Sequence, residues 1–90
     1  MNDQKVEVTA KVIELAAEQG GVDPAQVFPA THFVNDLNYD SLDLVEFTMS
    51  LEDEFEMSVP DDVAMDLRTV EQVVEYVMTH QMVAAAEKVE

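Results

Sequence analysis

The most informative stretch of the chain is residues 36–47, which read DLNYDSLDLVEF. Asp40 is followed three residues later by Asp43, a spacing that resembles a capping box and puts two carboxylates at the positive end of a helix dipole. We therefore predict a helix that begins at Asp40 or Ser41 and continues to about Met57. Ser41 then lies at the entrance of this helix, where a serine taken alone is interpreted as a cap.

The predicted helix carries two apolar stripes, although a surface helix needs only one. The first stripe consists of Leu44, Phe47, Leu51 and Phe55, with Thr48 beside them. The second stripe consists of Leu42, Val45 and Met49. We predict that the first stripe is buried, while the second is either additional core or an exposed contact strip among carboxylates.

Before this helix, the spacing of apolar residues predicts a first helix over residues 3–19, capped by Asn2 or Asp3 and ended by Gly20-Gly21. Its predicted buried face is formed by Val6, Ala10, Ile13 and Ala17, widened by Val12 and Ala16. A long loop over residues 20–40 follows, with a short helical turn expected after Pro24.

After it, Pro60 predicts a short third helix over about residues 60–66, and Thr69 with Gln72 forms a capping box for a last helix. The predicted buried face of that last helix is Val70, Val73, Val74, Val77 and Met78. These elements predict an all-α, four-helix bundle with a short third helix and a long loop between the first two helices.

The charge of the chain limits its partners. Its 90 residues carry 20 Asp and Glu against 4 Lys and Arg, a formal net charge of −16, and no Lys or Arg occurs between Lys11 and Arg68. Nucleic acids and anionic membranes would be repelled, so neither is expected as a partner. The acidic surface either serves solubility or is a docking surface that basic partners find by electrostatic steering.

Composition narrows the class further. The chain has no Cys, which excludes disulfides and thiolate metal sites. Its N-terminus lacks the apolar core of a signal peptide, and its longest apolar run, residues 82–86, is far shorter than the roughly 20 residues that span a bilayer. We expect a single cytoplasmic domain over residues 1–90, a monomer, in which residues 81–90 extend the last helix or fray.

The motif Asp40-Ser41-Leu42-Asp43 and its flanks resemble the acyl carrier proteins. The matching flanks are Val22-Asp23-Pro24, Phe33-Val34-Asn35-Asp36-Leu37, Val45-Glu46, Leu51-Glu52-Asp53-Glu54-Phe55, Val59-Pro60-Asp61 and Thr69-Val70. The resemblance covers essentially the whole chain and implies the acyl-carrier type of helical bundle. Tyr39 and Asn38 depart from the common pattern, which often has a small or aliphatic residue and a glycine there; Asn tolerates the left-handed backbone that such a glycine adopts.

The resemblance implies a carrier and not an enzyme. A phosphopantetheinyl transferase would attach 4′-phosphopantetheine to Ser41, and the arm would hold acyl groups as thioesters for acyl-transfer enzymes with basic docking patches. The pathway would be fatty-acid synthesis or, alternatively, a specialised lipid or polyketide pathway. The implied docking residues are Asp40, Leu42, Asp43, Val45, Glu46, Met49 and Glu52, and the residues implied to line the acyl cavity are Phe47, Leu51 and Phe55.

An acidic calcium-binding module is the alternative from another class. Asp36, Asn38 and Asp40 fit the first, third and fifth positions of a calcium loop. The sixth position is Ser41 where glycine is required, and the twelfth is Phe47 where a bidentate Glu is required. We therefore expect no calcium loop and no other metal site.

Overall fold

The structure is a computed structural model that describes residues 2–89, and the side-chain environments of residues 4–80. Within that range the chain forms five α-helices and one 3-10 helix, and its β-type pairing is an isolated bridge between His32 and Thr69. The elements are α1 (Asn2–Gly20), η1 (Pro24–Gln26), α2 (Phe33–Leu37), α3 (Ser41–Phe55), α4 (Asp61–Asp66) and α5 (Val70–Val89). The predicted all-α bundle is confirmed, with one additional helix, α2, in the long loop.

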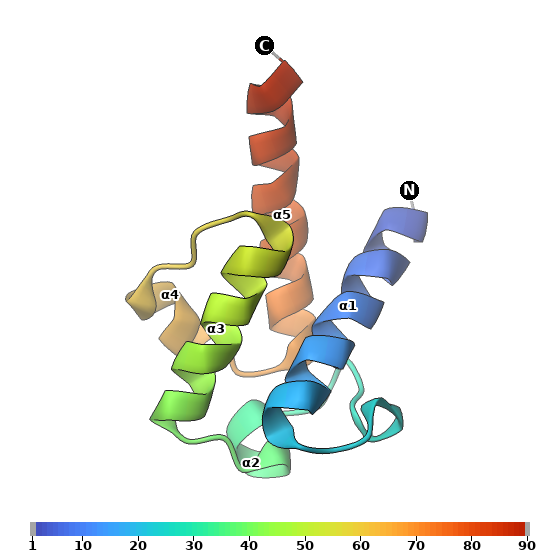
Figure 1. Ribbon diagram of the computed structural model, residues 1–90. Helices are drawn as coiled ribbons and strands as arrows, with labels where there is room; N and C mark the ends of the chain where they lie inside the picture. The colour runs from blue at the N-terminus through green and yellow to red at the C-terminus, as the bar shows by residue number, and fades with distance from the viewer. Residues whose placement is uncertain (1, 90) are drawn as a thin grey trace.

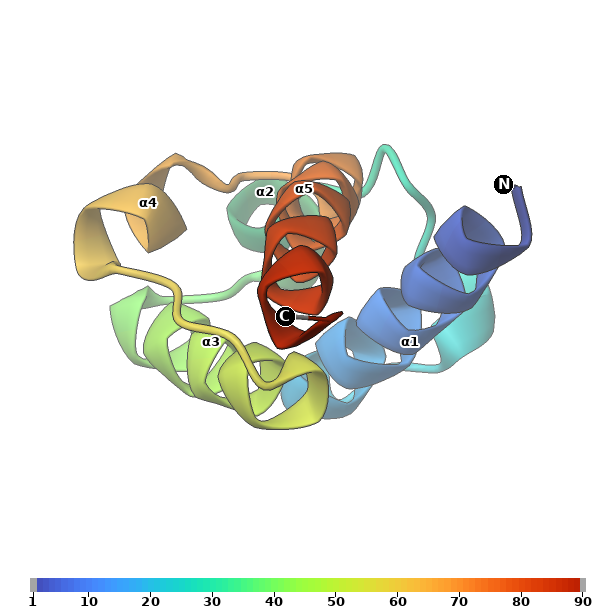
Figure 2. The ribbon, with the colours of Figure 1, turned by 90° about the horizontal axis from the view of Figure 1, so that it is seen from above.

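Three long helices form the body of the molecule. The helix α5 stands in the middle, with α1 on one side and α3 on the other, and α1 runs antiparallel to both (Figure 1). Seen from above, the short α4 lies across from α3 at the edge of the molecule (Figure 2). This arrangement leaves one side of α3 facing α4 and the other side facing α1.

The first helix buries only part of the face that its apolar spacing predicts: Val12, Ala16 and Ala17 are buried and Ile13 is half-buried. Val6 is 64% exposed and Ala10 is also exposed, so this part of the prediction is wrong. The buried residues of α1 are Val8, Val12, Ala16 and Ala17. Two apolar stripes overlap on this helix, and the spacing of apolar residues alone does not show which of them is buried. The small Ala16 lets the backbone approach Tyr39, whose hydroxyl donates to the Ala16 carbonyl at 2.6 Å, and this contact favours the observed rotation.

The buried face of α5 follows its sequence pattern. Its four predicted valines are at most 2% exposed, and Met78 is half-buried. The capping box at its start is also confirmed: the Gln72 side-chain oxygen accepts from the Thr69 N–H at 3.2 Å, and the Gln72 N–H donates to the Thr69 hydroxyl at 3.3 Å. Local signals therefore fix both the start and the rotation of this helix. The caps Asn2 and Asp3 and the side chains of residues 81–90 lie outside the described environments.

The long loop is more ordered than the sequence predicts. The helical turn expected after Pro24 is η1, but α2 was not predicted. A helix of five residues is too short to show a helical period, and its cap is the side chain of His32, which accepts from the Asn35 N–H at 3.1 Å. The usual capping residues are Ser, Thr, Asp and Asn, so His32 gave no start signal.

The remaining boundaries are close to those predicted. Pro60 is the N-cap of α4 rather than its first residue, and α3 ends at Phe55, two residues early, because Glu56 adopts a left-handed conformation with φ 52°. No helix within residues 2–89 combines the length and the apolar character needed to cross a membrane.

Candidate functional site

Ser41 is the first residue of α3, and its side chain is exposed. The cap of the helix is Asp40: its carboxylate accepts from the Asp43 N–H at 2.9 Å, and the Asp43 carboxylate accepts from the Asp40 N–H at 3.1 Å. The capping box is thus confirmed, and the interpretation of Ser41 as a cap is wrong. Among the described residues none is hydrogen-bonded to the Ser41 hydroxyl, which leaves it accessible from solvent.

The start of α3 is electrostatically asymmetric. The first turn of a helix has backbone N–H groups without intrahelical partners, and the positive end of the dipole lies there. Here the Asp43 N–H is taken by Asp40, and the Leu44 N–H donates to the Asp40 carbonyl at 3.1 Å. The hydrogen bond from the Asp40 backbone, followed by that from the Gln19 amide, lowers the pKa of the Asp43 carboxyl.

The two residues before Asp40 are held by a left-handed turn and by core packing. Asn38 has φ 60° and ψ 32°, so it takes the left-handed conformation expected of it and ends α2. Tyr39 is 3% exposed, and its ring packs on Phe33 and Phe47 with centroid distances of 5.4 and 6.0 Å. Burial, and to a lesser extent the charge of Asp43, raises the pKa of the Tyr39 hydroxyl.

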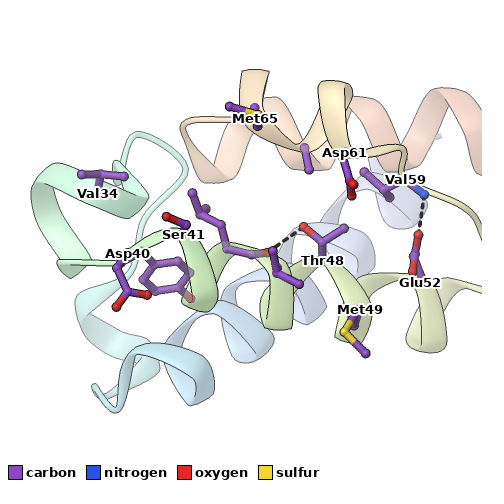
Figure 3. Close-up of a pocket in the computed structure, with 13 residues that line it drawn as sticks. Val34, Asp40, Ser41, Thr48, Met49, Glu52, Val59, Asp61 and Met65 are labelled. Atoms are coloured by element: carbon purple, nitrogen blue, oxygen red, sulfur yellow. Dashed lines mark hydrogen bonds between the residues drawn. The ribbon is translucent and has the colours of Figure 1, made fainter.

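An apolar groove begins at Ser41 and runs along α3 toward α4. Its volume is about 650 Å³. Figure 3 shows Val34 and Ser41 at one end, Glu52 and Val59 at the other, and Met65 on α4 opposite α3. The walls are mostly aliphatic, and the full lining is Val34, Tyr39, Asp40, Ser41, Leu44, Val45, Thr48, Met49, Glu52, Val59, Asp61, Ala64 and Met65. An exposed hydroxyl and an apolar groove large enough for a hydrocarbon chain therefore adjoin.

The residues expected to line an acyl cavity do not line this groove. Phe47 and Leu51 are 1% exposed core residues that border a small hollow of about 10 Å³, which has room for little more than a water molecule. Phe55 is half-buried and borders a different hollow near Val8 and Lys11. The prediction that the first stripe of α3 is buried holds for Phe47 and Leu51. None of the three residues lines the groove, because α4 stands against the other side of α3, and their assignment to an acyl cavity stays a prediction.

The second stripe of α3 is an exposed strip and not additional core. Leu42, Val45 and Met49 are 63%, 51% and 61% exposed. Val45 and Met49 also form an edge of the groove. The sequence had left both interpretations open, and the structure favours the exposed strip.

Some of the acidic residues around this strip have carboxylates that are hydrogen-bonded within the fold. Asp43 and Glu46 both accept hydrogen bonds from the side-chain amide of Gln19, at 3.2 and 2.8 Å. Glu52 is half-buried, and its carboxylate accepts from the Val59 N–H at 2.8 Å, so it holds the loop before α4 in place. These three acidic residues therefore also connect α3 to neighbouring segments of the fold.

Several residues of the site were not predicted. Val34, Val59, Ala64 and Met65 reach the groove from α2, the loop before α4, and α4 itself. Their positions depend on tertiary packing, which one sequence does not show. The one available signal was Met65, a large apolar residue among acids, which is 75% exposed.

The alternative calcium positions are used for helix capping. The Asp36 carboxylate accepts from the His32 N–H at 2.7 Å, Asn38 ends α2, and the Asp40 carboxylate caps α3. Within the described part of the chain, no three acidic or imidazole side chains are placed to hold a metal ion together.

Comparison with known proteins agrees with this geometry. Residues 10–77 match the family model described as a phosphopantetheine attachment site. The chain is 47% identical over 75 residues to an acyl carrier protein of Rubrobacter xylanophilus, covering 83% of this chain and 93% of that one. It is 39% identical over 75 residues to an acyl carrier protein of Cyanidioschyzon merolae, covering 83% and 82%. The chain therefore belongs to the acyl carrier protein family and contains its phosphopantetheine attachment domain.

Proposed function

We propose that Ser41 is the residue that carries the 4′-phosphopantetheine arm, and that the protein holds acyl groups on this arm and delivers them to other enzymes. The observation that carries the proposal is the exposed Ser41 hydroxyl, without a hydrogen-bond partner among the described residues, at the end of a groove of about 650 Å³. When attached, the arm supplies a terminal thiol to which an acyl group is joined as a thioester.

The residues around Ser41 suit a phosphodiester. Free backbone N–H groups and the positive end of the α3 dipole favour an anion at this position. The Asp40 and Asp43 carboxylates hydrogen-bond to each other's backbone N–H groups. Both carboxylates are thereby engaged in capping the helix, while the Ser41 side chain is exposed to solvent.

The protein acts as a substrate and carrier, and the chemistry is supplied by its partners. A serine nucleophile needs an adjacent base. His32 is occupied as the cap of α2, and His80 is hydrogen-bonded to the Tyr76 carbonyl on α5 at 2.9 Å. Activation of the Ser41 hydroxyl is therefore assigned to the phosphopantetheinyl transferase.

The partner enzymes dock on the exposed strip of Leu42, Val45 and Met49. Interfaces commonly have an apolar centre and a charged rim, and rim charges mainly set the rate of encounter. Asp40, Asp43, Glu46 and Glu52 form this rim, with Glu52 contributing less because it binds the Val59 N–H. Basic patches on acyl-transfer enzymes are the complementary surfaces. We also propose that the protein is a monomer and that it binds these enzymes in the cytoplasm.

We further propose fatty-acid synthesis as the pathway, in preference to a specialised lipid or polyketide pathway. The groove walls are aliphatic along most of their length, so a saturated chain would be sheltered well. A polyketide chain carries carbonyl groups that would lose hydrogen bonds to water there. Loading the protein with a saturated chain should therefore raise its melting temperature more than loading it with a polyketone of equal length. An equal or larger rise with the polyketone would favour the alternative.

The carrier role is tested by supplying acyl-coenzyme A and a promiscuous phosphopantetheinyl transferase. The expected result is a mass gain of one acyl-phosphopantetheine, from which hydroxylamine removes only the acyl group. Ser58 is an exposed serine outside the site, so Ser58→Ala is the matched control and should behave like the unaltered protein. A mass gain that hydroxylamine leaves unchanged would contradict the thioester.

A further inference from the structure

One side chain spans the seam between α1 and α3 next to the proposed attachment site. The side-chain nitrogen of Gln19, the penultimate residue of α1, donates to the Asp43 carboxylate at 3.2 Å and to the Glu46 carboxylate at 2.8 Å. Asp43 and Glu46 are on successive turns of α3, and Asp43 is two residues after Ser41. The Gln19 amide is therefore in direct contact with two acidic residues of the docking rim.

The stoichiometry of these hydrogen bonds is complete. A glutamine amide has two N–H donors, and each of the two carboxylates takes one. Asp43 and Glu46 are like charges three residues apart on a helix, so they repel each other and would otherwise spread into solvent. The Gln19 amide holds them close together without neutralising either charge. Lys11, by contrast, lies at the middle of α1 and pairs with Glu14 and Glu54.

This arrangement prepares the rim for a planar cation. A guanidinium group has several N–H donors in a fixed plane and binds best to acceptors that are already in position. Two ordered carboxylates offer such acceptors, and the Gln19 side-chain oxygen, to which none of the described residues donates, adds a third beside them. The acceptor set belongs to both α1 and α3.

We propose that Gln19 is a positioning residue of the docking surface: it presents Asp43 and Glu46 as one preordered acceptor for an arginine of the partner enzyme, so that the surface extends onto the end of α1. The inference rests on the proposed function, because the partner must act at Ser41. Ordering a side chain before binding removes a cost that is otherwise met on association, which corresponds to about a 2- to 10-fold change in affinity.

The test compares three variants in the transferase reaction with coenzyme A. Gln19→Leu removes both donors at similar volume, and Gln19→Glu removes them while adding a negative charge. Gln26→Leu is the matched control, because Gln26 is exposed on η1 and its side chain has no partner among the described residues. Circular dichroism and melting curves establish that each variant is folded.

Both Gln19 variants should raise the transferase KM about 2- to 10-fold with kcat unchanged, more at low salt than at high salt, while Gln26→Leu matches the unaltered protein. An NMR titration of Gln19→Leu should also show a higher Asp43 pKa. If only net charge mattered, Gln19→Glu would instead lower KM, and that result would overturn the inference. An unchanged KM in both variants would overturn it while leaving the proposed function intact. Absence of modification in the unaltered protein would overturn the proposed function, and the inference with it.

Discussion

Replacing Tyr39 with phenylalanine isolates one buried hydrogen bond beside the proposed attachment site. The Tyr39 hydroxyl donates to the Ala16 carbonyl at 2.6 Å, and both residues are at most 3% exposed. Tyr39→Phe keeps the ring and its packing on Phe33 and Phe47, so it creates almost no cavity. The expected loss comes from the missing hydrogen bond and from the carbonyl left without its partner.

The magnitude follows from the burial of this pair. A net hydrogen bond contributes about 0.5–1.5 kcal/mol, and leaving a buried polar group unpaired costs about 1–3 kcal/mol. The free energy of unfolding should therefore fall by about 1–3 kcal/mol, and for a domain of this size the melting temperature should fall by roughly 5–20 °C. Urea denaturation followed by circular dichroism measures the first quantity, and a thermal melt measures the second.

The chain offers a matched control at its other tyrosine. The Tyr76 hydroxyl donates to the Ser58 carbonyl at 3.4 Å in an exposed setting, so Tyr76→Phe should change stability by no more than about 0.5 kcal/mol. If Tyr39→Phe is as stable as the unaltered protein, or if the two variants lose equal stability, then the Tyr39 hydroxyl does not anchor the approach to Ser41.

Three other predictions follow from burial, ionisation and charge. Phe47→Ala should lower the free energy of unfolding by about 3–5 kcal/mol, whereas Met49→Ala on the exposed strip should change it little; equal losses in urea denaturation would mean that the strip is buried. Because folding raises the pKa of Tyr39, its contribution to stability is complete below the unfolded value of about 10 and is lost as the pH rises through the folded value. In a Tyr76→Phe background, tyrosinate absorbance should thus appear only as helical circular dichroism disappears, and tyrosinate in a fully helical protein would refute this. Glu46→Lys should slow the transferase reaction relative to the unaltered protein, more at low salt than at high salt. If the variant reacts at the rate of the unaltered protein at both salt concentrations, Glu46 does not belong to the docking rim.

Features set by local chemistry were predictable from the sequence. The Asp40–Asp43 and Thr69–Gln72 capping boxes and the end of α1 at Gly20 depend on residues within a few positions of one another. The exposed strip on α3 was visible as a second apolar stripe that a surface helix does not need. The attachment motif also lies within a short stretch, so the sequence by itself was enough to propose Ser41.

Features set by packing between distant segments were not predictable. The groove depends on where α4 places Ala64 and Met65 against α3, and no periodicity of either segment encodes that placement. The buried face of α1 depends on its contact with Tyr39, a residue more than twenty positions away. Gln19 is likewise more than twenty positions from the two carboxylates that it orders, which is why nothing in the local sequence singled it out.

The assignment of Ser41 as the attachment residue is tested by locating the attached group after reaction with coenzyme A and a promiscuous phosphopantetheinyl transferase. Intact mass gives the number of groups on each chain, and fragmentation of the modified peptide gives the residue. We expect one phosphopantetheinyl group per chain, attached to Ser41, and none on the Ser41→Ala variant. A group found on Ser50, Ser58 or any other residue, or an equal mass gain in Ser41→Ala, would contradict it.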